Sequence, residues 1–421
     1  MSRAPLALGL VAALLATGIG CGGSSAPPVP PAEARTPVPT VQPVRPPDAT
    51  SPYARALPPS LDAVRERLRG FVRTHGLAEP GNAWVLGHAL LALGPDATLA
   101  DGTPVVDHLF RTWAVASPVP GGPLLDFPGS LDGVPVQPHD GLFLKVFADL
   151  GVDPARPVIA AGEPATVGDL YRSTLYRTWV SDDALWASTP NDTPWVLQAL
   201  ASQAPAGLAW TALDGRAMTL DALTHRVVDE LVRQSAELHR WQARGEPYRK
   251  RGQGIFGFTC GGAHLLQGAG EAVGRGFGAP GDREAVAGEA QLQLWRLEQE
   301  LGVVDAALEQ APQFALLLTV QRLKFLGHHL ETVHRLAAVG LVPAGDATVL
   351  ANLERAEAEL ERTVGMLDRL GALQDPAAVR AAREQTWLDL IGDSAHAVRG
   401  LDLAAGAAGV PAQVAAPPAE R

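Results

Sequence analysis

The sequence predicts an all-α protein, an (α/α)6 toroid built from helical-hairpin repeats with small hairpin-like turns. Apolar residues recur at helical spacing through most of the chain, and a unit of two helices joined by a glycine turn repeats along it. Hydrophobic residues make up 47% of the 421 residues, which is enough for a large core. An open α-solenoid of stacked helix pairs fits the same repeat. The small number of units and the polar residues that recur on the inner helices favour the closed ring.

The overall charge excludes one class of partner. Lys and Arg total 34 against 45 Asp and Glu, so the formal net charge is −11 at pH 7. A nucleic-acid-binding surface needs a concentration of basic residues to neutralise phosphates. We therefore expect no nucleic-acid partner.

Residues 1–20 have the composition of a secretory signal peptide. Arg3 precedes an apolar run over residues 6–19, which is shorter than the roughly 20 apolar residues that span a bilayer. Cys21 follows a small residue, and this arrangement resembles a bacterial lipoprotein signal, in which the cysteine becomes the lipidated first residue. Gly18 stands where that family prefers Leu, and ordinary cleavage to a soluble secreted product is the alternative. The resemblance implies a lipoprotein anchored by lipid to a bilayer of the bacterial cell envelope.

Residues 21–59 are expected to form a disordered, proline-rich linker behind the lipidated cysteine. Between Pro27 and Pro59 there are 12 prolines, and such a composition favours extended polyproline II structure. Residues 403–421 are rich in Ala, Gly and Pro and are expected to be a disordered tail. The folded domain is therefore predicted over residues 60–402.

Capping residues and apolar stripes predict about twelve helices in that domain. Ser60 is the predicted N-cap of the first helix, and Thr166 and Thr219 are the predicted N-caps of later ones. Asp192 precedes a proline in the first turn of another helix. The longest helices are predicted near residues 219–242, 283–301, 313–339, 346–370 and 376–399.

The repeat is clearest around two tryptophans. Trp84 and Trp195 occupy matching positions in two similar segments, and each is followed by an Ala/Leu-rich helix. A glycine turn then leads to a second helix in each unit. The predicted turns lie at Asp101–Gly102, Ala161–Gly162 and Asp214–Gly215.

Three motifs resemble those of a bacterial lipoprotein or secreted family. They are Cys260–Leu265, Gly327–Glu331 and His139–Gly141. Members of that family look like α/α-toroids of the prenyltransferase and terpenoid-cyclase type, and the resemblance covers roughly residues 80–340. The resemblance implies this fold but does not imply an activity.

Aligning the repeats places polar and aromatic residues at the leading ends of the inner helices. Parallel inner helices would bring these ends to one end of a cavity, where helix N-termini favour an anionic group. The candidate ligand-binding residues are Asn82, Trp84, His88 and Trp195. The candidate catalytic residues are His139, Asp140, Asp192, Cys260, His264 and His328. For the two tryptophans a place in the core is the plainer interpretation, and for Asp140 a helix cap.

Cys260, His264 and His328 form the sharpest group. With Cys21 lipidated, Cys260 is the one remaining thiol of the chain. Cys and His four residues apart on a helix can both face a zinc ion, and a distant His with water would complete its coordination. Protein prenyltransferases use an Asp, a Cys and a distant His for zinc, but Phe258 stands here where the Asp would be. A Cys–His nucleophile and base, or a structural role between closely packed helices, are the alternatives.

Two classes of function follow from these predictions. In the first, the toroid cavity binds or processes a small molecule, a glycan or an isoprenoid-like ligand. In the second, the protein is a non-catalytic envelope lipoprotein that scaffolds or docks a protein partner. Convergence of the candidate residues in one place would favour the first class, and their dispersal into separate helix contacts would favour the second.

Overall fold

The computed structural model shows a mostly helical protein, with 13 α-helices in the part of the chain that it describes. The described residues are 36–45, 48–119, 122–179, 192–247, 250 and 254–411. The predicted signal peptide over residues 1–20 and the predicted lipidation site at Cys21 lie outside them. Among the described helices, none combines the length and apolar character that a bilayer-spanning segment requires.

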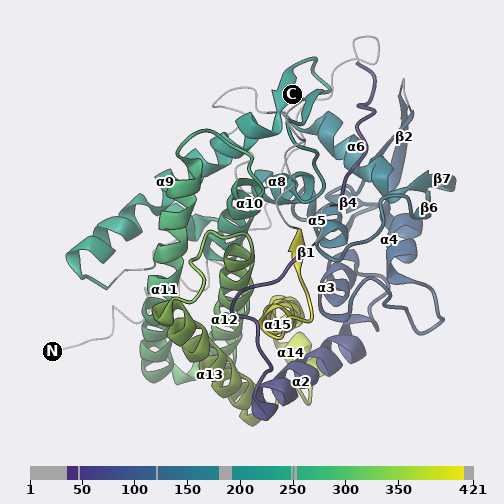
Figure 1. The fold of residues 1–421 in the computed structure, drawn as a ribbon. Helices are drawn as coiled ribbons and strands as arrows, with labels where there is room; N and C mark the ends of the chain where they lie inside the picture. The colour runs from purple at the N-terminus through teal and green to yellow at the C-terminus, as the bar shows by residue number, and fades with distance from the viewer. Residues whose placement is uncertain are drawn as a thin grey trace.

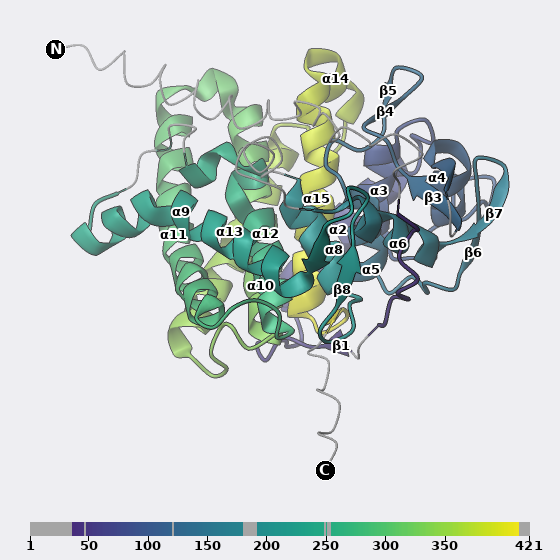
Figure 2. The ribbon, with the colours of Figure 1, turned by 90° about the horizontal axis from the view of Figure 1, so that it is seen from above.

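Six helices follow one another in a cycle of contacts that returns to its start. Each packs against the next in chain order, and the last packs against the first. They are buried along most of their length, and α10, α12 and α15 bury charged and polar residues as well as apolar ones. Figure 1 looks along the last of them, and Figure 2 shows it lengthwise. The six are α3 (Ala83–Leu93), α5 (Leu142–Asp149), α8 (Thr193–Ala201), α10 (Ala263–Gly274), α12 (Ala315–Ala338) and α15 (Glu384–Ala404).

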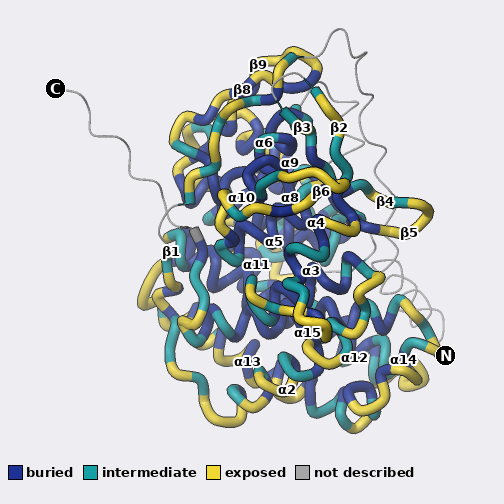
Figure 3. Tube along the Cα trace, turned by 90° about the vertical axis from the view of Figure 1, so that its right-hand side faces the viewer, coloured by how far each residue is buried: buried dark blue, intermediate teal, exposed yellow. Residues whose placement is uncertain are grey.

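A second set of six helices packs on the outside of the first. Five of them carry one buried face and one exposed face, whereas α6 is buried along nearly its whole length, and Figure 3 shows the buried residues gathered toward the middle of the molecule. α9 contacts α10 and α11, and α13 contacts α12 and α2. The outer helices are α2 (Pro59–Gly76), α4 (Val105–Trp113), α6 (Val167–Arg177), α9 (Leu220–Arg244), α11 (Asp282–Gln310) and α13 (Ala347–Arg369). A short helix, α14 (Pro376–Ala382), packs on α15.

The small strands form two-stranded antiparallel ribbons. The predicted turn at Ala161–Gly162 joins β6 to β7, and the predicted turn at Asp214–Gly215 joins β8 to β9. Ala161 and Gly162 both have positive φ, as a tight hairpin turn requires. The ribbons pair β2 (Val115–Val119) with β3 (Gly122–Asp126), β4 (Ser130–Leu131) with β5 (Val134–Pro135), β6 (Pro157–Ala160) with β7 (Glu163–Thr166), and β8 (Ala209–Thr211) with β9 (Ala217–Thr219).

The predicted domain boundaries are too narrow at both ends. In the expected linker, Val38 is buried and the backbone N–H of Asp346 donates to the hydroxyl of Tyr53 at 3.0 Å. A strand from the expected linker, β1 (Asp48–Ala49), pairs with a strand from the expected tail, β10 (Val410–Pro411). The proline-rich segment cannot form a helix, but its few apolar and aromatic side chains are enough to pack it onto the domain.

The predicted helix caps are partly correct. Thr219 accepts a hydrogen bond from the backbone of its helix, and Thr166 forms a capping box with Asp169, so both predictions are confirmed. The prediction for Ser60 is wrong, because α2 begins one residue earlier, at Pro59. Proline is favoured at the first helical position, where its missing N–H costs nothing.

Candidate functional site

Four histidines and two tryptophans from the inner helices gather at one place. The His264 ring lies 3.8 Å from Trp195 and 4.9 Å from His328, measured between centroids. The His396 ring lies 3.9 Å from His328 and 5.5 Å from His88, which in turn stacks on Trp84. α3, α8, α10, α12 and α15 all contribute to this aromatic cluster.

The structure brings Cys260, His264 and His328 together at the edge of this cluster. One potential ligand atom from each residue lies within 4.8 Å of the other two. Ligand atoms around a tetrahedral zinc ion lie about 3.3–3.6 Å apart, given bond lengths of about 2.0–2.3 Å. The three side chains therefore need only small movements to share one ion.

The route by which Cys260 reaches the cluster differs from the prediction. Cys260 is not on the helix of His264, because α10 begins at Ala263. Instead Cys260 lies in a 3-10 helix, η3 (Thr259–Gly262), with a φ of 54° and a ψ of 35°. A left-handed conformation is rare for a residue with a side chain and costs about 1–3 kcal/mol, which is typical of functional positions. The tight turn, rather than helical periodicity, directs the thiol to the two histidines.

His264 and His328 have polar atoms that the described residues leave unsatisfied. The two side chains are 3% and 2% exposed. Both nitrogens of each ring lack a hydrogen-bond partner among the described residues. A buried polar group without a partner costs about 1–3 kcal/mol, so four such nitrogens side by side require an explanation. Burial and the neighbouring histidines lower the pKa of both rings well below the usual value, which keeps them in the neutral form that binds metal ions.

The environment of Cys260 argues against a reactive thiol. Burial raises the pKa of its thiol to about 12, although Lys324 acts in the opposite direction. Nucleophilic cysteines have lowered pKa values, because the thiolate is the reactive form. A bound cation would deprotonate the thiol directly. Among the alternatives for this residue, metal ligation therefore fits better than nucleophilic catalysis.

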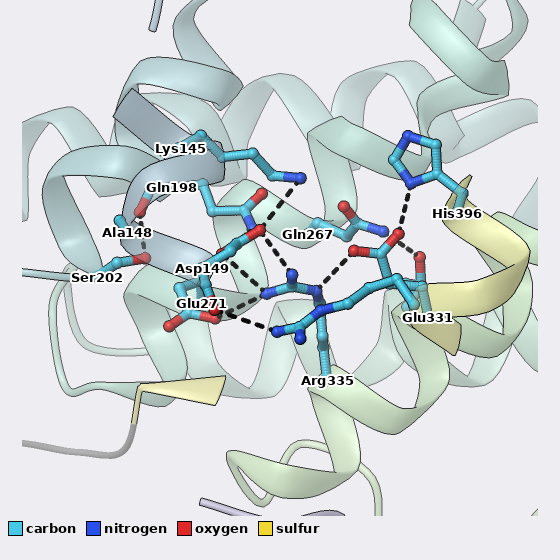
Figure 4. Close-up of polar contacts among 12 residues, drawn as sticks. Lys145, Ala148, Asp149, Gln198, Ser202, Gln267, Glu271, Glu331, Arg335 and His396 are labelled. Carbon is cyan, nitrogen blue, oxygen red and sulfur yellow. Dashed lines mark hydrogen bonds and ion pairs between the residues drawn. The ribbon is translucent and has the colours of Figure 1, made fainter. Parts of the chain in front are cut away.

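A buried network of charged groups supports His396 beside the cluster (Figure 4). The His396 Nδ1 atom lies 2.7 Å from Glu331 Oε2, and Arg335 Nε donates to Glu331 Oε1 at 3.0 Å. Arg335 also donates to Asp149 Oδ2 at 2.6 Å, and Lys145 Nζ lies 3.3 Å from the same oxygen. Burial acts to raise the pKa of Glu331, but His396 and Arg335 hold it well below its usual range. Glu331 is thus a fixed negative charge beside the cluster.

Glu331 also belongs to a second group of potential ligands. A ligand atom from His328, one from Glu331 and one from His396 lie within 4.8 Å of one another. The two groups share His328. The negative charge of Glu331 therefore lies next to any cation that His328 binds.

Three further ionisable residues, missed in the sequence, lie near Cys260. The Lys324 Nζ atom is 3.3 Å from Asp389 Oδ1 and 4.0 Å from Asp393 Oδ2. Burial acts to lower the pKa of Lys324, but the two aspartates outweigh it. The net pKa lies above the usual value, so this lysine stays charged. Burial raises the pKa of Asp393 well above its usual value. These groups give the surroundings of Cys260 a strongly polar character.

His139 and Asp192 form a hydrogen-bonded pair close to the same cluster. The His139 Nδ1–H donates to Asp192 Oδ1 at 2.9 Å, and the His139 ring stacks on Trp195 at 5.0 Å with an interplanar angle of 7°. The other ring nitrogen, Nε2, lies 3.2 Å from the hydroxyl oxygen of Thr259. Thr259 is not among the predicted site residues, and its position directly before Cys260 is the one signal in the sequence that points to it.

Two predicted site residues lie outside the two groups of potential metal ligands. The side chain of Asn82 accepts a hydrogen bond from the backbone N–H of Val85 at 3.0 Å, so Asn82 acts as the N-cap of α3. The N-cap of α5 is Gly141, so Asp140 does not cap the helix, but burial and the nearby Asp126 raise the pKa of its carboxyl to about 6, and Asp192 and His139 also act on it. Trp84 and His88, by contrast, belong to the aromatic cluster, and burial lowers the pKa of His88 to about 3.

Comparisons of the chain with protein-family models, with curated proteins and with solved structures found no match.

Proposed function

We propose that this protein is an envelope-anchored lipoprotein whose helical toroid binds a zinc ion through Cys260, His264 and His328 and processes a polar ligand beside it. One observation carries the proposal. The potential ligand atoms of the three residues lie within 4.8 Å of one another, and all four histidine nitrogens are buried without partners among the described residues. If these residues lay apart in separate helix contacts, a non-catalytic scaffold lipoprotein would be the better proposal.

The helix contacts support an (α/α)6 toroid. Six buried helices contact one another in a closed cycle, and six further helices pack outside them. An open solenoid has two free ends, and its first and last repeats do not meet. The contact between α15 and α3 therefore favours the ring and the toroid family that the sequence motifs resemble.

The donor set suits zinc. One thiolate and two imidazoles match the sulfur and nitrogen ligands that zinc prefers, and three protein ligands leave a fourth position for water or substrate. Such an ion supplies Lewis acidity and a bound water of lowered pKa. The chain itself supplies Lys324, Glu331 and Asp393 as charged or polar groups near the ligands.

The buried charges distinguish between the candidate ligand classes. Lys324, Asp389 and Asp393 form a polar, ion-paired group near Cys260, to which an isoprenoid-like chain could offer no hydrogen bonds. A hydroxylated ligand, such as a glycan, offers donors and acceptors to all three. We therefore favour a glycan-like ligand, bound at the envelope.

Metal analysis of the purified chain tests this function, with one pair of variants as the comparison. We expect about one zinc per chain in the wild type and almost none in His328→Ala. His329→Ala is the matched control, because His329 is the next residue, is equally buried, and bonds instead to Gln293 and Asn352. A wild-type protein without stoichiometric metal, or equal loss in both variants, contradicts the proposal.

The lipid anchor is tested separately. Wild-type protein is expected in the membrane fraction of the bacterial envelope, and Cys21→Ser is expected in the soluble fraction. Membrane retention of the Cys21→Ser variant would contradict anchoring through that residue.

A further inference from the structure

Thr259, His139 and Asp192 lie in a hydrogen-bonded series. The carboxylate of Asp192 accepts from His139 Nδ1 at 2.9 Å, and in the neutral imidazole this bond leaves Nε2 as the acceptor. Nε2 can then accept the proton of the Thr259 hydroxyl, whose oxygen is 3.2 Å away. A hydroxyl, an imidazole and a carboxylate in this order are the parts of an acyl-transfer triad.

Three separate segments supply the members of this triad. His139 lies in the loop before α5, Asp192 is the N-cap residue of α8, and Thr259 is the first residue of η3. Asp192 does not bond to the start of its own helix through its side chain, so its carboxylate is available for the histidine. His139 and Asp192 are 5% and 7% exposed, whereas Thr259 is partly exposed, as a nucleophile must be.

The turn that follows Thr259 fixes its position. Cys260, Gly261 and Gly262 all have left-handed backbone conformations. A Cβ on Gly262 would lie 2.3 Å from the side chain of Ile255, so the turn is closely packed. The hydroxyl is therefore held by rigid structure, which favours productive geometry.

An unpaired donor lies beside the triad. The indole ring of Trp195 stacks on His139, and its Nε1–H is buried without a partner among the described residues. Trp195 is 4% exposed. A buried donor aimed at developing negative charge can stabilise the oxyanion of an acyl-transfer reaction. The absence of a described partner for this N–H points to a ligand atom.

We propose that Thr259 is the nucleophile of a metal-independent acyl-transfer site that accepts carboxylic esters. The Thr259 oxygen attacks the ester carbonyl carbon, and its proton passes to His139 Nε2. The bond to the alcohol then breaks, and the alcohol leaves with that proton. Water next attacks the acyl-threonine, gives its proton to His139, and releases the acid while the proton returns to Thr259. No oxidant or metal is needed, and none of the three residues is a zinc ligand in the proposed function.

Covalent labelling of the full chain, purified in detergent, tests the nucleophile. An alkyl fluorophosphonate reacts with activated hydroxyls, forming an O–P bond as fluoride leaves with the proton. We expect one label per chain, located by peptide mapping at Thr259. Thr259→Val should abolish labelling, Thr259→Ser should restore it, and Asp192→Asn should slow it by about 10³-fold or more.

Matched variants separate the triad from general effects on the fold. Thr178→Val is the control, because its hydroxyl bonds only to the helix carbonyl of Thr174 among the described contacts, at 2.7 Å. It should label at the wild-type rate. With 4-nitrophenyl acetate as substrate, Trp195→Phe should lower kcat about 10²-fold with little change in KM.

Chelator treatment distinguishes this inference from the proposed function. The metal-free chain should still label at Thr259, since the triad does not include the ion. Labelling at Cys260, labelling that survives His139→Asn, or a lack of label at Thr259 in the folded chain would overturn the triad. A chain that holds no zinc as purified, before any chelator is added, but labels at Thr259 would contradict the zinc proposal and leave the triad standing.

Discussion

Replacing Glu331 by Gln tests whether its charge supports the zinc site. Glu331 is fully buried, and its two carboxylate oxygens bond separately to His396 and Arg335. The substitution keeps the shape of the side chain but removes its negative charge. Arg335 then remains beside the cluster with less compensation, which disfavours a divalent cation.

The expected loss follows from the position of Glu331. One of its oxygens lies within 4.8 Å of a His328 nitrogen, so Glu331 directly adjoins the proposed ligands. Removal of a carboxylate next to metal-binding histidines weakens metal affinity by about 10–100-fold. This corresponds to about 1.4–2.8 kcal/mol of binding free energy. We expect a decrease in zinc affinity within that range, measured by competition with a chromophoric chelator at constant pH.

Glu289→Gln is the control for this experiment. Glu289 is also buried and also bonds to a histidine, with His239 Nε2 at 2.8 Å, but it lies on an outer helix. Its variant should bind zinc like the wild type. Unchanged affinity in Glu331→Gln, or an equal decrease in both variants, would refute the account of Glu331.

Three further predictions concern the turn, the N-terminal segment and pH. Gly262→Ala would place a Cβ 2.3 Å from the side chain of Ile255, so this variant should lose zinc and melt at a lower temperature. Gly281 also has a left-handed backbone but has open space around it, so Gly281→Ala should keep its zinc. Tyr53→Phe should lower the free energy of unfolding in urea by about 0.5–1.5 kcal/mol, because it removes the hydrogen bond that attaches the segment before α2 to Asp346. An unchanged midpoint of the urea unfolding curve would contradict that attachment. A hydrogen bond to Asp282 raises the pKa of His225 in the folded protein above the unfolded value of about 6.5. Protonated His225 therefore stabilises the fold fully at pH values below about 6.5, and this stabilisation is lost as the pH rises through the folded-state pKa. His225→Gln should therefore lower Tm more at about pH 5 than at about pH 9, and the reverse order would contradict the sign.

The helical architecture could be predicted from the sequence to a large extent. The strong apolar periodicity of α9, α12 and α13 predicts them close to their observed bounds. The segment before α2 could not be predicted in the same way. Its packing depends on a few isolated contacts, such as those of Val38 and Tyr53, and these leave no periodic pattern.

The candidate site, like the fold, could be predicted from the sequence only in part. The aligned repeats place His264 on α10 and His328 on α12 at matching positions, and the two lie near one another, but Cys260 reaches them through a strained turn that periodicity does not describe. Thr259 and Glu331 were missed as site residues because their roles depend on hydrogen bonds between elements distant in the chain. Such bonds depend on how the helices pack, which the sequence pattern alone does not specify.

X-ray absorption at the zinc edge tests the central claim most directly. The account predicts a zinc ion in the purified wild-type chain with one sulfur neighbour at about 2.3 Å and nitrogen or oxygen neighbours at about 2.0–2.1 Å. The sulfur contribution should disappear in Cys260→Ser. A spectrum from a stoichiometric ion with only nitrogen and oxygen neighbours, or a wild-type chain that holds no zinc, would contradict it.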